Sequence, residues 1–202
     1  MKTVTKCIIS ACLCIITLSG GFKSYAIGGG GENNAKDNND STSSSVFIDR
    51  YFAIKDTKKE MKDYFAYYAA TTYPLEVFLG RFDEIKKANP EMKKYFGNYA
   101  ASQYKLEDFL KRFHEIKAAY PKMETAYGDY AASKWPLEKF VTRYFQIKDS
   151  NPKLDAKNYS AYAGGYYTLE DYLARLNGIK ASFPKFQDCF APYASSYNKL
   201  MK

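Results

Sequence analysis

The chain has 202 residues and a formal net charge of +8, with 26% charged and 17% aromatic residues. This moderate basicity favours anionic partners in general, but it is too low for a dedicated nucleic-acid binder, so nucleic acid is not expected as a partner. The chain contains four cysteines, three of them within the first 14 residues, which excludes a disulfide framework in an exported domain.

Residues 1–26 have the pattern of a secretory signal peptide. A basic start with Lys2 and Lys6 precedes an apolar run from Cys7 to Leu18, and Ser24-Tyr25-Ala26 offers a small-residue cleavage site. The apolar run is shorter than the ~20 residues that a bilayer requires, and no later segment is apolar enough, so we predict no membrane span. We therefore expect a secreted protein, extracellular or periplasmic, whose net charge falls to +5 once residues 1–26 are removed.

Residues 27–45 are rich in Gly, Asn and Ser and hold almost no apolar side chain. Such a segment buries too little surface to offset the entropy lost on ordering. We predict a flexible leader over residues 27–45, followed by one α-helical repeat domain over residues 46–202.

A sequence repeat of about 31 residues occurs in about five copies along this domain. The two most similar copies start at Phe78 and Phe109. One arginine marks each copy, at Arg50, Arg81, Arg112, Arg143 and Arg175. A fixed period of this length is typical of stacked helical repeats.

The sequence pattern within each copy predicts two short antiparallel helices joined by a turn. In the second copy, apolar residues from Leu75 to Ile85 recur at spacings of three and four, which places them on one face of a helix. The first helices are predicted to begin near Val46, Pro74, Lys105, Pro136 and Thr168. Because proline suits a first helical turn, the second helices are predicted to open at Pro90, Pro121, Pro152 and Pro184, and Pro192 is expected to kink or end the last one.

We predict an all-α fold of tandem helix-turn-helix repeats, stacked as a short α-solenoid or a compact helical array. One helix pair buries too few apolar side chains to offset the entropy of ordering its residues, so the pairs must pack on their neighbours. The open solenoid is preferred, because every copy keeps the same faces apolar. The architecture resembles that of tetratricopeptide repeats, which are about 34 residues long. The Trp–Leu–Gly–Tyr pattern of that family is absent, so we assign no family.

Several positions of the repeat hold one residue type in most copies. The structural interpretation pairs each arginine with a glutamate of the neighbouring copy, in a ladder that sets the register between copies. A lysine ends each first helix, where it suits the negative end of the helix dipole. A tyrosine follows the core spacing of the second helices and is expected to be buried, with its hydroxyl bonded to a carbonyl or to water. This tyrosine column comprises Tyr68, Tyr99, Tyr130, Tyr162 and Tyr193.

The functional interpretation makes the same positions a periodic binding surface. Cationic side chains would attract sulfate, phosphate or carboxylate groups, while aromatic faces in the turns would stack on sugars. The candidate partner-binding residues are Lys86, Lys117, Lys148, Tyr104, Trp135, Tyr167, Arg81, Arg112 and Arg143. The chain holds 20 Tyr and 14 Phe, more than a core of short helices needs. We therefore expect a non-enzymatic binding or adhesion protein whose basic, Tyr-rich face takes a surface protein or an anionic polysaccharide.

A carrier of haem or of a small apolar ligand is the alternative. Tyr64 with Tyr68, and Tyr95 with Tyr99, stand one helical turn apart, and tyrosinate can ligate haem iron. No catalytic, cofactor-binding or metal-binding residue is predicted, because no nucleophile–base set and no metal-ligand spacing occurs in the sequence. Cys189 is expected to be a small buried residue, although it could join two chains as a dimer.

Overall fold

The computed structural model describes residues 46–201, so the predicted signal peptide over 1–26 and the leader over 27–45 lie outside the described residues. Within residues 46–201 the secondary structure is helical, apart from an isolated bridge between Val46 and Lys199. The α-helices are α1 (Phe47–Thr57), α2 (Phe65–Ala70), α3 (Leu75–Ala88), α4 (Phe96–Ala101), α5 (Leu106–Ala119), α6 (Tyr127–Ala132), α7 (Leu137–Ser150), α8 (Ala156–Gly164), α9 (Leu169–Ser182) and α10 (Phe190–Ser195). Short 3₁₀ helices precede four of the even-numbered helices: η1 (Lys59–Tyr64), η2 (Pro90–Tyr95), η3 (Glu124–Ala126) and η4 (Gln187–Cys189).

The odd-numbered helices, called the outer helices below, begin where the sequence predicts. Their N-caps are Val46, Pro74, Lys105, Pro136 and Thr168. Each outer helix begins directly after an extended cap residue, and α3, α5, α7 and α9 carry Glu in their first turn, near the positive end of the helix dipole. The local sequence alone is therefore enough to place these helix starts.

The even-numbered helices, called the inner helices below, are shorter than predicted. Pro90 does open a 3₁₀ helix, but α4 begins only at Phe96. Pro192 does not kink or end α10, and that prediction is wrong. Pro192 lies in the first turn of α10, where a backbone N–H has no acceptor within the helix. The N–H that proline lacks therefore costs the helix no hydrogen bond.

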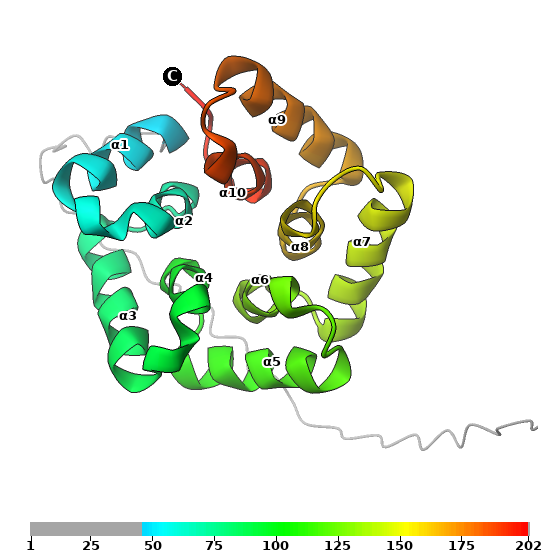
Figure 1. The fold of residues 1–202 in the computed structure, drawn as a ribbon, viewed down its shortest axis with the longest axis horizontal. Coiled ribbons are helices and arrows are strands. Elements are labelled where there is room, and N and C mark those ends of the chain that lie inside the picture. Colours follow the sequence, from blue (N-terminus) through cyan, green and yellow to red (C-terminus); the bar gives the residue numbers. More distant parts are fainter. Residues whose placement is uncertain (1–45, 202) are drawn as a thin grey trace, which may run out of the picture. The chain divides into compact units, whose positions relative to one another are not determined.

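The helix pairs form a ring rather than antiparallel hairpins. Figure 1 shows the inner helices end-on around the centre and the outer helices side-on around them, so the predicted antiparallel pairing is wrong. Each inner helix packs against the inner helix of the next pair, from α2 through α4, α6 and α8 to α10. Inner helix α10 in turn packs against α2.

This last contact closes the array, so the open solenoid that the sequence favoured is not formed. The N–H of Phe47 donates to the carbonyl of Lys199 (2.8 Å). The Asn198 amide donates to the carbonyls of Ala69 (2.6 Å) and Thr71 (2.9 Å). A buried apolar cluster also joins the first and last pairs, with Phe47 and Ala69 packed with Ile179 and Cys189. The compact helical array is the arrangement that the structure shows.

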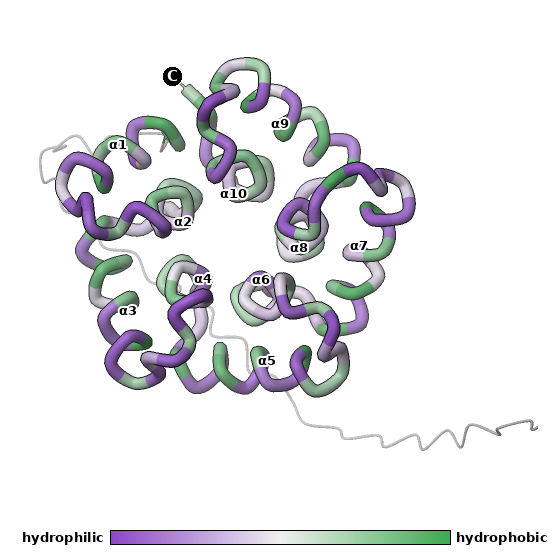
Figure 2. Tube along the Cα trace, in the orientation of Figure 1, coloured by the Kyte–Doolittle hydropathy of each residue, from purple (hydrophilic) through white to green (hydrophobic). Residues whose placement is uncertain are grey.

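The apolar core lies between the outer and inner helices. Figure 2 shows hydrophobic and hydrophilic residues alternating along the outer helices, as expected for helices with one buried face. Phe78, Phe109 and Phe140 are fully buried, and so are Tyr99 and Tyr130 of the tyrosine column. This core position of the tyrosines is as predicted, but their hydroxyl partners are side chains of the outer helices. Tyr99 donates to Glu84, Tyr130 to Glu115, and Tyr162 to Gln146 (2.8 Å).

Candidate functional site

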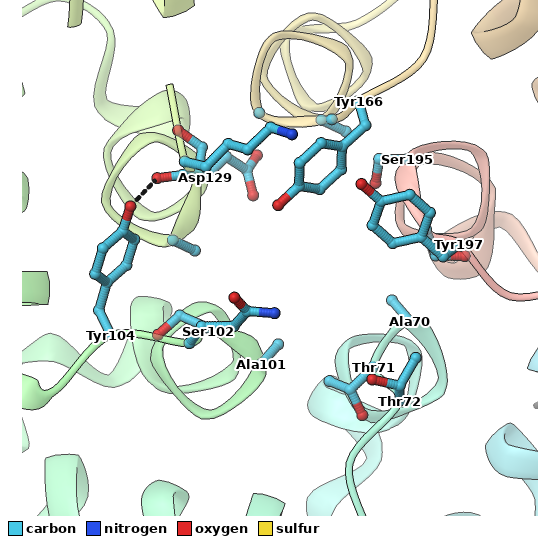
Figure 3. Close-up of a pocket in the computed structure, with 18 of the residues that line it drawn as sticks. Ala70, Thr71, Thr72, Ala101, Ser102, Tyr104, Asp129, Tyr166, Ser195 and Tyr197 are labelled. Atoms are coloured by element: carbon cyan, nitrogen blue, oxygen red, sulfur yellow. Dashed lines mark hydrogen bonds between the residues drawn. The ribbon is translucent and has the colours of Figure 1, made fainter. Parts of the chain in front are cut away.

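A cavity of about 440 Å³ opens at the centre of the ring, where the inner helices end. Its wall includes the last residues of these helices, Ala70, Ala101, Ala132, Gly164 and Ser195 (Figure 3). These side chains are small, and they leave open the space around which the helix ends converge. The turns that follow the inner helices complete the wall.

Arginines from the outer helices cap the inner helices around this cavity. Arg112 of α5 donates through Nη2 to the carbonyls of Tyr130 (3.1 Å) and Trp135 (2.6 Å), and its guanidinium lies 4.3 Å from the centre of the Tyr130 ring. Arg50, Arg81, Arg143 and Arg175 make the equivalent contacts in their own pairs. The carbonyls at a helix C-terminus lack partners within the helix and carry its negative dipole end, which suits a cation.

The predicted Arg–Glu ladder is therefore wrong. Among residues 46–201 the ion pair that forms is Lys94 with Glu124 (2.8 Å), on the exposed surface. The arginines bond to backbone carbonyls of their own helix pair, so Arg81, Arg112 and Arg143 stabilise the inner helix ends. Arg81 and Arg112 make these bonds through Nη2, while the Nε of each is buried without a hydrogen-bond partner.

The aromatic residues of the turns link neighbouring helix pairs. The hydroxyl of Tyr73 donates to the carbonyl of Ser102 (3.2 Å), and that of Tyr104 to the carbonyl of Ser133 (3.0 Å). The indole N–H of Trp135 donates to the carbonyl of Gly165 (2.7 Å). Tyr104, Trp135 and Tyr167 are half-buried at the cavity end of the ring. Tyr73, Tyr104 and Trp135 therefore help to set the register between neighbouring helix pairs.

The second residue after each inner helix faces the cavity, and it is a different residue type in each of the first four pairs, with tyrosine in both the fourth and the fifth. We call these residues the variable turn residues: Thr72, Gln103, Lys134, Tyr166 and Tyr197. All of them are exposed, and no protein hydrogen bond within the described chain engages the side chain of Thr72 or Gln103. The ring therefore presents different polar groups around one cavity.

Three of these side chains form a stack at the rim. The Lys134 ammonium lies 3.7 Å from the centre of the Tyr166 ring and 4.8 Å from that of Trp135. The rings of Tyr166 and Tyr197 lie 4.6 Å apart (Figure 3). Burial, the charge of Tyr166 and a hydrogen bond with it together raise the pKa of Tyr197 to about 12. Tyr197 is therefore neutral at physiological pH.

Asp129 of α6 brings a carboxylate to the same cavity. One of its oxygens accepts from the amide of Asn98 (2.8 Å), and the other accepts from the hydroxyl of Ser160. Burial raises the pKa of Asp129 to about 6, although these two hydrogen bonds act in the opposite direction. Asp129 as a whole residue is half-buried, while its carboxyl group lies buried between Asn98 and Ser160 at the wall of the cavity.

Glycines allow the inner helices to approach closely beside Asp129. A Cβ atom at Gly128 would lie 2.4 Å from the amide oxygen of Asn98, and one at Gly97 would lie 2.5 Å from the Tyr67 ring. Asn98 can therefore lie against α6 and reach Asp129 only because residue 128 has no side chain.

The structure does not bring the predicted lysines and aromatic residues together. Lys86, Lys117 and Lys148 are exposed in the last turns of α3, α5 and α7, next to the segments that lead to the N-terminal ends of the inner helices. The aromatic turn residues follow the C-terminal ends of the inner helices. Along α7, the 14 residues from Leu137 to Ser150 separate the two sets by about 20 Å, at 1.5 Å per residue.

Sequence reasoning missed Asp129 and the variable turn residues. A signal for the latter was present, because Ser or Thr precedes this position in most copies and an aromatic residue follows it. Different residues within such a uniform frame mark a position that the repeat itself does not constrain. Asp129 carried no comparable signal, since it resembles the many carboxylates of the helices.

The tyrosines considered for haem do not line the cavity. Tyr68 and Tyr99 are buried in the core, while Tyr64 and Tyr95 donate to the carbonyls of Lys93 (3.1 Å) and Glu124 (3.3 Å). Cys189 is buried as a free thiol, and burial raises its pKa to about 12. Its position fits a small core residue and does not support a disulfide-linked dimer.

Within residues 46–201, no cluster of His, Cys, Asp and Glu side chains has the arrangement needed to hold a metal ion. None of the helices described combines the length and the apolar character that crossing a bilayer requires. Comparison of the chain with protein-family models, curated proteins and solved structures finds no match. The function must therefore be argued from the site itself.

Proposed function

We propose that the chain is an exported, non-enzymatic binding protein whose partner is an anionic glycan. The observation that carries this proposal is the central cavity, around which an otherwise uniform ring presents Thr72, Gln103, Lys134, Tyr166 and Tyr197. The capping arginines, which serve the fold, are the same residue in every pair, whereas this exposed position changes its chemistry around the cavity. Different polar groups at one position of the ring are explained by a ligand that touches each of them differently.

A glycan suits this surface better than a protein partner does. Protein interfaces have an apolar centre, whereas the exposed large apolar residues of the described chain are scattered. They are Phe52, Val77, Phe145, Tyr166, Tyr197 and Met201, and the rings of the two tyrosines contact each other. Hydroxyl, amide, ammonium and aromatic groups around a concave site are the groups that bind a polyhydroxylated ligand.

The charge of the chain favours a glycan that is anionic. Basic residues exceed acidic ones, and the capping arginines bring positive charge near the cavity without a carboxylate partner in the described structure. Long-range attraction of this kind raises the rate of association with a polyanion.

We propose a binding role rather than catalysis because neither histidine nor cysteine of the described chain lines the cavity. His114 lies exposed on α5, and Cys189 is buried away from the cavity wall. A general acid–base pair or a nucleophile with its base requires at least two such groups within hydrogen-bond reach. The alternative of a haem carrier gains no support, because Tyr64, Tyr95 and Tyr99 are hydrogen-bonded elsewhere and Tyr68 is buried in the core.

The test is retention on a sulfated-polysaccharide column, measured as the salt concentration that elutes the protein. One variant changes Lys86, Lys117 and Lys148 to Gln. A second changes Lys105, Lys134 and Lys139 to Gln, which removes the same charge at the cavity end. We expect the unmodified protein to elute well above physiological salt and the second variant to elute earlier.

If only the first variant loses retention, the polyanion binds at the end of the ring that carries Lys86, Lys117 and Lys148, as the sequence predicts. If the unmodified protein is not retained on the column, the partner is not an anionic glycan. A surface protein would then be the remaining binding partner to pursue.

A further inference from the structure

We infer that the central cavity binds one acidic sugar residue, a hexuronic acid, with its carboxylate at Lys134 and its hydroxyls toward Asp129, Gln103 and Thr72. This inference rests on the proposed glycan-binding function and names the part of the glycan that enters the ring.

The size of the cavity limits the ligand to a short unit. A volume of about 440 Å³ lies near the lower end of the ~300–1,000 Å³ range of small-molecule pockets. The space accepts a sugar ring with part of its neighbour. A polymer can therefore enter by an end or a branch, while the rest of its chain stays outside the ring.

The polar groups fit adjacent hydroxyls, each of which both donates and accepts. The Asp129 carboxylate has about four acceptor sites, and Asn98 and Ser160 occupy two of them. The amide of Gln103 offers a donor and an acceptor, and the hydroxyl of Thr72 can do the same. These groups lie on three different inner helices or turns, so they converge on a ligand from separate sides.

The charges orient the ligand. Lys134 has no carboxylate partner in the described chain, and its ammonium rests against the rings of Tyr166 and Trp135. A ligand carboxylate there would form a charge-assisted hydrogen bond, which is stronger than a neutral one. Asp129 would repel the same group from its own side of the cavity. An acid is therefore held at the rim and hydroxyls at Asp129.

The rim also provides an aromatic surface for the apolar face of a sugar ring. Tyr197 is 60% exposed, while Tyr166 has Lys134 and Tyr197 against it. The side of Tyr197 away from Tyr166 is the surface on which a sugar ring can rest. Stacking of this kind adds contact area with little loss of side-chain entropy, because the tyrosine is already held by its neighbour.

Trp135 provides an internal reporter, because it is the only tryptophan of the chain and Lys134 touches it. The purified protein is titrated with galacturonate and glucuronate, each matched to its neutral hexose, galactose or glucose, at constant ionic strength. We expect a saturable change of Trp135 fluorescence with at least one uronate and an affinity about tenfold weaker for the matching hexose.

Variants assign the contacts. Lys134→Gln should reduce uronate affinity to that of the hexose, and Lys134→Arg should preserve the preference. Asp129→Asn should weaken binding of the hexose, and weaken binding of the acid less, because the variant also loses the repulsion between Asp129 and the ligand carboxylate. Lys122→Gln, at an exposed lysine outside the cavity wall, is the matched control and should bind as the unmodified protein does.

The inference is wrong if neither uronate gives a saturable signal, if the hexoses bind equally well, or if Lys134→Gln retains the preference for the acid. Column retention is measured separately with a polymer. A protein that is retained on the column but silent in the titration would keep the glycan function and lose the cavity as its site.

Discussion

Replacing Asp129 with asparagine tests the energetic cost of placing a carboxylate in the central cavity. Its pKa is about 6 in the folded chain, against an ordinary value of 3.8. The folded state therefore binds this proton more tightly than the unfolded state does. Its contribution to stability is greatest at low pH and is lost as the pH rises from about 4 through about 6.

The two pKa values set the size of the effect. Each unit of difference between the folded and unfolded pKa values corresponds to 1.36 kcal/mol. Ionised Asp129 therefore destabilises the fold by up to about 3 kcal/mol at neutral pH. Solvent that enters the cavity screens this charge, so we expect a cost of roughly 1.5–3 kcal/mol. Asparagine keeps an acceptor for the Asn98 amide and carries no charge. The Asp129→Asn variant should therefore be more stable than the unmodified protein by this amount at pH 8, and about equally stable near pH 4.

The assay is urea unfolding of both proteins at several pH values between 4 and 8. The difference between them isolates Asp129 from the other titrating groups, and Asp108→Asn, an exposed change on α5, controls for loss of a carboxylate as such. If the difference stays constant across the pH range, or if the variant is less stable at pH 8, the reasoning about burial is refuted. A confirmed cost would mean that the fold tolerates a destabilising carboxylate, as binding sites often do.

Three further predictions, with four variants, test the architecture by urea unfolding. Arg112→Met removes the donor to the Trp135 carbonyl and the stacking on Tyr130, although Ser133 still donates to the Tyr130 carbonyl. We expect a loss of about 2–4 kcal/mol, and a loss below 1 kcal/mol would contradict the capping role. Gly128→Ala should cost about 1–3 kcal/mol because its Cβ meets Asn98, whereas Gly80→Ala, with nothing within 4 Å, should stabilise α3 by about 0.5–1 kcal/mol. Equal effects at the two glycines would refute the close approach. Asn198→Ala removes both bonds to the first helix pair and should cost about 2–3 kcal/mol, and an unchanged stability would mean that ring closure does not depend on them.

The positions of the outer helices could be read from the sequence because their causes are local. Spacings of three and four, a capping turn and a proline act within a few residues, so Pro74 and Thr168 mark helix starts wherever the pair lies in space. The buried tyrosines followed from the same spacing.

The partners of the arginines required the tertiary structure. A guanidinium can donate to a carboxylate or to a carbonyl, and the sequence offers Arg112 both kinds of acceptor. The steep crossing of outer over inner helix decides between them, because it sets Arg112 beside the end of α6.

Ring closure and the cavity were also decided in three dimensions. The period of the sequence determines that the helix pairs pack alike, but the turn from one pair to the next depends on how closely the inner helices approach. Gly97 and Gly128 set that approach, and the accumulated turn brings Asn198 to Ala69 across almost the whole domain. In the sequence Asp129 is one carboxylate among many. It becomes a candidate ligand only because α6 faces the centre of the ring, a consequence of packing between residues distant in the chain.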